Sequence, residues 1–209
     1  MRLDHIVVGC ADLQSGTDWL EARLQVPAGG GGEHVGYGTH NRLWRLDANR
    51  YLELIALQPG AECDRTPLFG LGEQSVRDRL ASGPRLLSWV ALAPSDLPDE
   101  SVIAGVPGLA APVSVRRGDF QWRLAVQSDG GLCDGGVMPY IIWWQPPHPT
   151  DALPESGLAL TELSLHTPNV EPLRRLLADD AGREPVCVSP GAPSLVAHLS
   201  GPAGQVVID

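Results

Sequence analysis

The sequence predicts an α+β fold in which a strand–helix–strand–strand–strand module is repeated. Two observations support this prediction: strand-like and helix-like patterns alternate from the first residues onward, and the same order of patterns returns later in the chain. Apolar residues make up 43% of the 209 residues, which is enough for an ordinary packed core. The 24 glycines and 19 prolines indicate many turns and short elements.

The first module is predicted over residues 1–57. The segment LDHIVVGC, residues 3–10, alternates and is rich in β-branched residues, so it predicts a strand. Asp12 is a suitable N-cap for a helix whose leucines recur at helical spacing and which ends at VPAGGGG. A short strand is expected near residues 34–38. The segments HNRLWRLD and YLELIAL, joined by a polar turn, predict two further strands.

The same order of patterns recurs in residues 85–146 and in residues 158–209. In the second, degenerate module, RLLSWVALAP is strand-like, a proline-interrupted helix follows, and APVSVRR, FQWRLAVQ and MPYIIWWQ predict three strands. In the third module, LALTELSLHTPN predicts a strand, VEPLRRLLADD a helix, and PVCVS, SLVAHLS and GQVVID the remaining strands. Residues 58–84, with a short helix, and the proline-rich residues 147–157 connect the modules within one compact unit.

The composition favours a small-molecule partner. The formal charge is −10 and the isoelectric point about 4.9, so phosphate backbones would repel the chain and no nucleic acid is expected as a partner. The longest apolar segment, around LLSWVALA, is too short to cross a membrane, and MRLDHIVVGC lacks the apolar run of a signal peptide. The four cysteines are scattered without a C-x-x-C motif, so we expect a cytoplasmic protein with reduced thiols.

Several segments spread over nearly the whole chain resemble one superfamily. They are LDHIVVGCADL, GYGTHNRLWRL, YLELIAL, PRLLSWVA, WRLA, GGVMPYIIWW and LTELSLHTPN. With these segments the chain resembles the vicinal oxygen chelate superfamily, and more closely its glyoxalase-like domain group. The resemblance implies that the modules form curved, cup-like mixed sheets with helices packed on the outside. It also implies that two modules pair and that the ligand lies inside the cup.

The resemblance points to His5 and Glu53 as catalytic residues and metal ligands. In metal-using members the first strand of a module supplies a His or Gln and its last strand a Glu, and these two residues stand at those positions. Alternation also places Leu3, His5 and Val7 on one face of the first strand. Glu53 lies among large apolar residues, so its charge needs a partner or a proton. A divalent ion shared with His5 and a metal-free Glu–His hydrogen bond both meet that need.

A metal site would need a further ligand, because a catalytic divalent ion usually takes about three protein ligands. The third module aligns Glu162 with His5, whereas Trp89 stands at that position in the second module. His40 or His148 are the other candidates for a third ligand. Zinc, iron, manganese, nickel and magnesium are equally compatible with such ligands, and a protein without any cofactor remains an alternative. Without a metal, a Glu53 with a raised pKa could still abstract a proton.

Two groups of residues are expected to bind substrate. In the segment EHVGYGTHN, the side chains of His34, His40 and Asn41 would line the mouth of the cup, and the alternative is a flexible turn with solvated histidines. The second group is Trp122, Arg123, Trp144 and His148. Trp122 and Arg123 alternate along a strand, so only one of them can face inward, and an inward arginine would bind a carboxylate. The alternative for this group is simple sheet packing with an exposed arginine.

These residues support two functional hypotheses. The first is an enzyme that acts on a small oxygenated metabolite, by isomerase, lyase or dioxygenase chemistry, with Glu53 as general base or metal ligand. The second is a protein of the same fold that binds or sequesters a small molecule without turnover. A homodimer that completes each cup is a third expectation.

Overall fold

A computed structural model of the chain describes residues 1–94, 99–178 and 185–209. The strand–helix–strand–strand–strand order occurs three times, which confirms the α+β class and the repeated module. The first module consists of β1 (Arg2–Gly9), α1 (Leu13–Leu24), β2 (Gly30–His34), β3 (Thr39–Arg45) and β4 (Tyr51–Leu57). The second consists of β5 (Arg85–Leu92), α3 (Asp99–Ile103), β6 (Val113–Arg117), β7 (Phe120–Ala125) and β8 (Tyr140–Gln145). The third consists of β9 (Ala159–Thr167), α5 (Glu171–Leu176), β10 (Val186–Pro190), β11 (Ser194–Gly201) and β12 (Gly204–Ile208).

Short helices occupy the connecting segments. These are α2 (Gln74–Leu80), α4 (Pro149–Ala152) and a 3-10 turn at Leu68–Gly70, and a second 3-10 turn at Cys133–Gly136 joins β7 to β8. The predicted helix VEPLRRLLADD corresponds to α5, and residues 179 and 180 at its predicted end lie outside the described residues. Within the described ranges, no helix is both long and apolar enough to cross a membrane.

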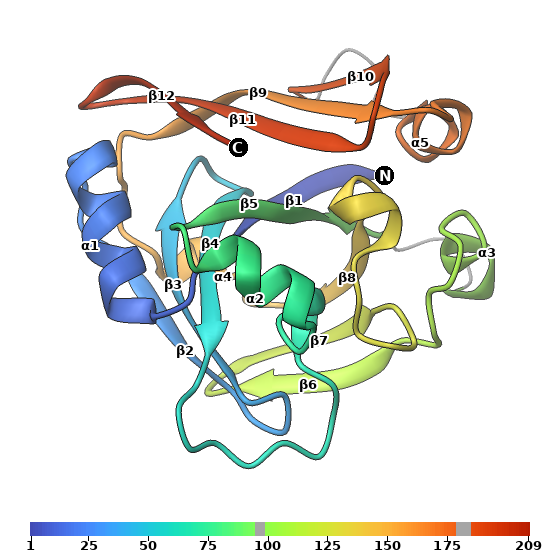
Figure 1. Ribbon diagram of the computed structural model, residues 1–209, viewed down its shortest axis with the longest axis horizontal. Coiled ribbons are helices and arrows are strands. Elements are labelled where there is room, and N and C mark those ends of the chain that lie inside the picture. Colours follow the sequence, from blue (N-terminus) through green and yellow to red (C-terminus); the bar gives the residue numbers. More distant parts are fainter. Residues whose placement is uncertain (95–98, 179–184) are drawn as a thin grey trace.

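The first two modules share one eight-stranded sheet with the strand order β2-β3-β4-β1-β5-β8-β7-β6. The first strands of the two modules, β1 and β5, pair antiparallel at its centre, and each has the last strand of its own module as a parallel neighbour. The edge strands β2 and β6 approach each other, so the sheet curves into a nearly closed cup (Figure 1). The pairing of two modules follows the expectation from the resemblance.

The third module repeats the order of elements but not the strand pairing. Its strands form a separate sheet in the order β10-β9-β11-β12, in which the first strand lies between the second and third. The last strand β12 pairs with β11, whereas β4 in the first module pairs with β1. The third module therefore forms a layer over the outside of the cup and supplies no wall to it (Figure 1).

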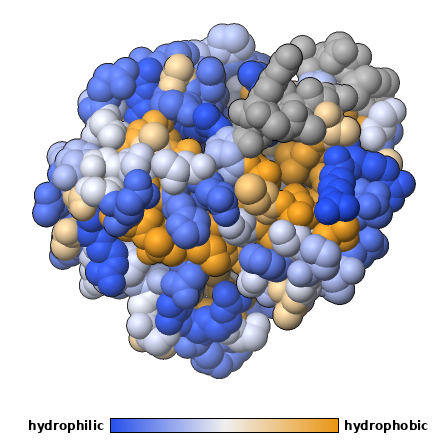
Figure 2. Space-filling view, turned by 90° about the horizontal axis from the view of Figure 1, so that it is seen from above, coloured by the Kyte–Doolittle hydropathy of each residue, from blue (hydrophilic) through white to orange (hydrophobic). Residues whose placement is uncertain are grey.

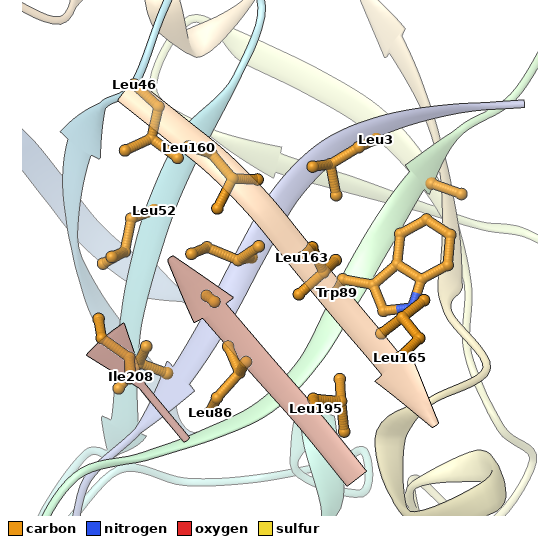
Figure 3. Packing of buried hydrophobic residues seen from close by; sticks show 14 of the residues in the cluster. Leu3, Leu46, Leu52, Leu86, Trp89, Leu160, Leu163, Leu165, Leu195 and Ile208 are labelled. Carbon is orange, nitrogen blue, oxygen red and sulfur yellow. The ribbon is translucent and has the colours of Figure 1, made fainter. Parts of the chain in front are cut away.

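The main core lies between this layer and the cup. Leu163 and Leu165 of β9 are fully buried and lie with Leu3 of β1 and Trp89 of β5 in one cluster of apolar residues (Figure 3). Each such side chain contributes roughly 1.5–3 kcal/mol when it is fully removed from water. Along β9 buried and more exposed residues alternate, because one face of the strand is turned outward. Seen from the side of the four-stranded sheet, the surface mixes hydrophilic side chains with apolar areas (Figure 2).

Helix α1 forms where the sequence predicts it and packs over β3 and β4. The carboxylate of Asp12 accepts a hydrogen bond from the backbone N–H of Ser15 and so caps the helix. Leu20 and Leu24 are buried beneath the helix, and Gln25 ends it in a left-handed conformation.

The second strand begins earlier than the prediction of residues 34–38. Strand β2 occupies Gly30–His34, so the glycines form a strand, while helix α1 ends at Leu24, just before VPAGGGG, as predicted. They are suited to this place because β2 lies very close to its neighbours. A Cβ atom on Gly31 would overlap the carbonyl oxygen of Asn41 in β3.

Leu163→Ala should lower the free energy of unfolding by about 2–5 kcal/mol, because it leaves a cavity between the two sheets. Urea denaturation followed by tryptophan fluorescence measures this change. Val35→Ala is the matched control, since Val35 is 82% exposed, and it should change the stability by less than about 0.5 kcal/mol. Equal effects of the two substitutions would mean that the four-stranded sheet does not stabilise the cup.

Candidate functional site

The cup encloses a small cavity with a polar floor and aromatic walls. Its polar lining residues are His5, His34, Asn41, Tyr51, Glu53 and Arg117, and Trp122, Trp144 and Phe69 are among the walls. The free volume is about 30 Å³. A cavity needs roughly 10–15 Å³ on this measure to hold one water molecule, so the space is small.

Glu53 points into this cavity from the middle of β4. Its neighbours Leu52 and Leu54 are fully buried on the opposite face, in the core below α1. The strand is therefore covered on both sides, as the apolar pattern predicts. The Glu53 side chain is only 6% exposed, so its carboxylate depends on protein partners for compensation.

A bulge in β1 brings two consecutive residues to the site. Leu3 pairs with Ala91 and His5 with Val90, so Asp4 between them has no partner across β5. Leu3 therefore packs in the core, while His5 lines the cavity of the cup and Asp4 bonds to His5 and to the cavity residue Trp144. The prediction that Leu3 shares a face with His5 was wrong, because strict alternation does not anticipate the extra residue of a bulge.

The imidazole of His5 lies between two buried carboxylates. Its Nδ1 is 2.6 Å from Oδ1 of Asp4, and its Nε2 is 3.4 Å from Oε2 of Glu53. The ring of Tyr51 stacks on the imidazole with the centroids 4.4 Å apart. Asp4, His5 and Glu53 therefore form a row of three ionisable groups with almost no access to water.

The charges in this row stabilise one another. Burial alone would lower the pKa of His5, but hydrogen bonds and charge attraction from Asp4 and Glu53 raise it to about 9. Burial would raise the pKa of Glu53, but the hydrogen bond and charge of His5 and the hydrogen bond from Asn41 lower it to about 2. The pKa of Asp4 is likewise lowered, against the effect of burial, by hydrogen bonds from His148 and His5. The pKa of Glu53 is therefore lowered and not raised, because the interactions with His5 and Asn41 outweigh desolvation.

The second oxygen of Glu53 belongs to a separate amide network. Asn41 Nδ2 donates to Glu53 Oε1 at 2.6 Å and lies 3.3 Å from His34 Nε2. Arg117 Nη1 donates to Asn41 Oδ1 at 3.0 Å. Burial lowers the pKa of His34 to about 4, so its imidazole is neutral and can accept from Asn41. Thr39 Oγ1, 3.0 Å from His34 Nδ1, holds the ring in place.

Several of the residues expected at the site converge on the cavity. His5, His34, Asn41, Glu53, Trp122 and Trp144 line it. His148 does not line the cavity but contacts Asp4 behind it, with Nε2 3.2 Å from Oδ2 of Asp4 and its side chain 19% exposed. Trp144 Nε1 donates to the same Asp4 oxygen at 3.1 Å.

Three other candidates lie elsewhere. His40 precedes Asn41 in β3 and points to the opposite face of the strand, near the charge of Asp12. Arg123 pairs with Asp99 and lies against the ring of Trp143, at 5.2 Å from the ring centroid. Glu162 belongs to the four-stranded sheet and accepts a hydrogen bond from Ser164.

The sequence reasoning did not single out Asp4 or Arg117. An acid directly before the strand histidine is a signal for Asp4, but only a bulge lets both side chains face inward. Arg117 ends β6 just before the turn to β7, and it enters the cavity because the edge strands of the cup meet there. No pattern along one strand contains that information.

The donors do not fit a bound divalent ion. Across the described residues, no group of three or more His, Cys, Asp or Glu side chains is arranged to hold a metal. The amide N–H group of Asn41 stands between Glu53 and His34, and the Arg117 cation lies behind it. These positive groups fill the space that a metal ion beside Glu53 would need. They also already compensate the negative charge of its carboxylate.

A family model described as a glyoxalase-like domain matches residues 3–180. The chain belongs to the glyoxalase-like family. The match includes both modules of the cup and the beginning of the third module. A comparison with curated proteins found no match.

Solved structures show a weaker likeness to this glyoxalase-like chain. Methylmalonyl-CoA epimerase from Mycobacterium tuberculosis is 17% identical, with a TM-score of 0.43 over 72% of this chain and 91% of that one. A variant of the Streptomyces coelicolor methylmalonyl-CoA epimerase, in complex with 2-nitronate-propionyl-CoA, is 19% identical, with a TM-score of 0.44 over 68% and 94%. A hypothetical protein from Bacillus halodurans is 15% identical, with a TM-score of 0.41 over 70% and 95%. The family assignment rests on the domain match.

The raised pKa of His5 predicts how stability depends on pH. A histidine whose pKa is higher in the folded state stabilises the protein fully below its unfolded pKa of about 6.5, and this contribution is lost as the pH rises through the folded value of about 9. The free energy of unfolding should therefore fall across this range, and His5→Gln should flatten the fall. Urea denaturation at several pH values measures it.

His198→Gln, in the four-stranded sheet, is the matched control and should keep the parent profile. A His5→Gln variant with the same pH profile as the parent would contradict the bridging of two carboxylates by an imidazolium.

Proposed function

We propose that the protein is an enzyme in which Glu53 removes a proton from a carbon next to a carbonyl group of a small oxygenated metabolite. The observation that carries this proposal is the buried row formed by Asp4, His5 and Glu53. Ionisable groups with strongly shifted pKa values at the floor of a closed cavity are characteristic of catalytic sites. A purely structural role would not require such a row of ionisable groups, two of which line the cavity of the cup.

Glu53 is suited to the role of base because it stays ionised at neutral pH. A carboxylate with a pKa of about 2 holds a proton weakly, so the driving force for proton removal must come from stabilisation of the anion that forms on the substrate. His5 supplies this stabilisation. Its Nε2 lies 3.4 Å from Glu53, a long distance for a charged pair, so the N–H group, held by the fixed ring at the edge of the cavity, can also donate to a substrate oxygen.

Asp4 acts through His5 and need not touch the substrate. Its carboxylate accepts from Nδ1, which fixes the ring orientation and leaves Nε2 as the donor to the cavity. Trp144 and His148 hold the other oxygen of Asp4 in place. The imidazolium can therefore persist where water cannot solvate it, and the same exclusion of water strengthens its interaction with a substrate anion.

Proton removal next to a carbonyl begins epimerisation, isomerisation and elimination, so the proposal favours an isomerase or a lyase. Two of the similar solved structures are methylmalonyl-CoA epimerases, which is compatible with this class. A binding protein without turnover remains the competing function, since Trp122, Trp144 and Tyr51 also give the cavity an aromatic wall.

Exchange of substrate hydrogen with solvent tests the proposal directly. A panel of small 2-oxo and 2-hydroxy compounds in D2O, followed by NMR, should show deuterium entering at the carbon beside the carbonyl for at least one compound. Glu53→Gln should slow this exchange by at least about 100-fold, because it removes the base while preserving the shape of the side chain.

Glu33→Gln is the matched control, because Glu33 is an exposed carboxylate of β2 that bonds to Gln58, and it should exchange like the parent. Binding of compounds without any deuterium incorporation would favour the binding protein. Exchange at the parent rate in Glu53→Gln would overturn the assignment of the base.

A further inference from the structure

We infer that Arg117 binds a carboxylate group of the ligand, so that the substrate class is a small carboxylic acid bearing an oxygen next to the carboxylate. The binding role follows from the geometry of Arg117, whereas the conversion of the bound acid as a substrate rests on the proposed function. Arg117 replaces Arg123 as the inward arginine that the sequence predicts, since Arg123 faces away from the cavity and pairs with Asp99.

Arg117 reaches the cavity across the seam between the two edge strands of the cup. It is the last residue of β6, and its side chain lies against Gly32 of β2. A Cβ atom at Gly32 would lie 2.7 Å from Cδ of Arg117, and the three heavy atoms nearest to that position all belong to Arg117. The glycine-rich strand therefore leaves a channel through which this one side chain enters.

The guanidinium group has spare donors and no acidic partner. Nη1 donates to Asn41 Oδ1 at 3.0 Å, which uses one of the five N–H groups. In the described part of the chain no carboxylate lies within 4.0 Å of the Arg117 nitrogens, whereas Arg123 is paired with an aspartate. A partly buried cation that lines a cavity and lacks an anion is arranged to receive one from a ligand.

The rest of the cavity favours a planar monoanion. A carboxylate matches the edge of a guanidinium with two parallel hydrogen bonds. A phosphate dianion would meet stronger repulsion from Glu53 and Asp4, which are both ionised and buried. The aromatic face of Trp122, 6.0 Å from the guanidinium carbon, limits the site further to a small acid.

Asn41 sets the spacing between the two ends of such a ligand. Its amide joins Arg117 on one side to Glu53 on the other. A carboxylate held by Arg117 would therefore place the adjoining carbon atoms beside Asn41, toward Glu53 and His5. A 2-oxo or 2-hydroxy acid has its second oxygen at this position, within reach of the His5 N–H group.

Calorimetric titration of the full chain with glycolate, lactate and pyruvate tests the inference, with lactamide as the uncharged counterpart of lactate and inorganic phosphate as the competing anion. At least one carboxylate should bind, and lactamide and phosphate should bind at least about ten times more weakly. Arg117→Met should weaken the carboxylate by about 10- to 100-fold, the range for hydrogen bonds to a charged group. Arg123→Met is the matched control in the adjoining strand and should bind as the parent does.

Two milder variants keep the test decisive if Arg117→Met folds poorly. Arg117→Lys keeps the charge but loses the paired hydrogen bonds, so its affinity should fall between those of the parent and Arg117→Met. Gly32→Ala keeps the arginine but displaces its side chain, and it should weaken carboxylates while leaving the fold, measured by circular dichroism, unchanged.

Carboxylate binding that is unaffected in all three variants, or tighter binding of phosphate or lactamide, would overturn the inference. Because binding is measured without turnover, the two proposals fail separately. Arginine-dependent binding without deuterium exchange would support the carboxylate ligand and contradict the enzymatic function. Deuterium exchange on compounds that lack a carboxylate would support the enzymatic function and contradict the carboxylate ligand.

Discussion

The site depends on one interaction, the contact of the His5 imidazolium with a carboxylate on each side. Two buried carboxylates next to each other would repel and one would take up a proton. With the cation between them, Asp4 and Glu53 both remain ionised although almost no water reaches them. The same cation gives the cavity a donor for an oxygen atom and leaves Glu53 as a base, so the electrostatics of the fold and the chemistry of the site have one origin.

The surrounding architecture serves this contact. Strand β1 lies at the centre of the eight-stranded sheet and is paired on both sides, by β4 and β5. Pairing with β4 brings His5 beside the strand that carries Glu53, and the bulge turns Asp4 inward as well. The four-stranded sheet of the third module then covers the outer face of β1 and β5, so that the polar row lies in the interior of the molecule (Figure 1). A cup without that outer layer would leave its central strands open to solvent on one face.

The sequence predicts those features that follow from periodicity. It does not predict features that depend on how distant strands pair. Alternation in YLELIAL places Glu53 among leucines on a strand covered on both sides, and the spacing of leucines after Asp12 identifies α1. The bulge at Asp4 depends on the register between β1 and β5, which local pattern does not contain. The pairing of β9 with both β10 and β11 is likewise a property of the assembled sheet, and so is the entry of Arg117 beside Gly32.

The protonation state of His5 is the most direct test of this account. NMR of the protein labelled with 15N in its histidine rings reports the protonation of both ring nitrogens as the pH is varied. The account predicts that His5 carries a proton on each nitrogen at neutral pH and loses one only near pH 9. A neutral His5 ring at pH 7, titrating at or below the ordinary histidine pKa of about 6.5, would contradict it.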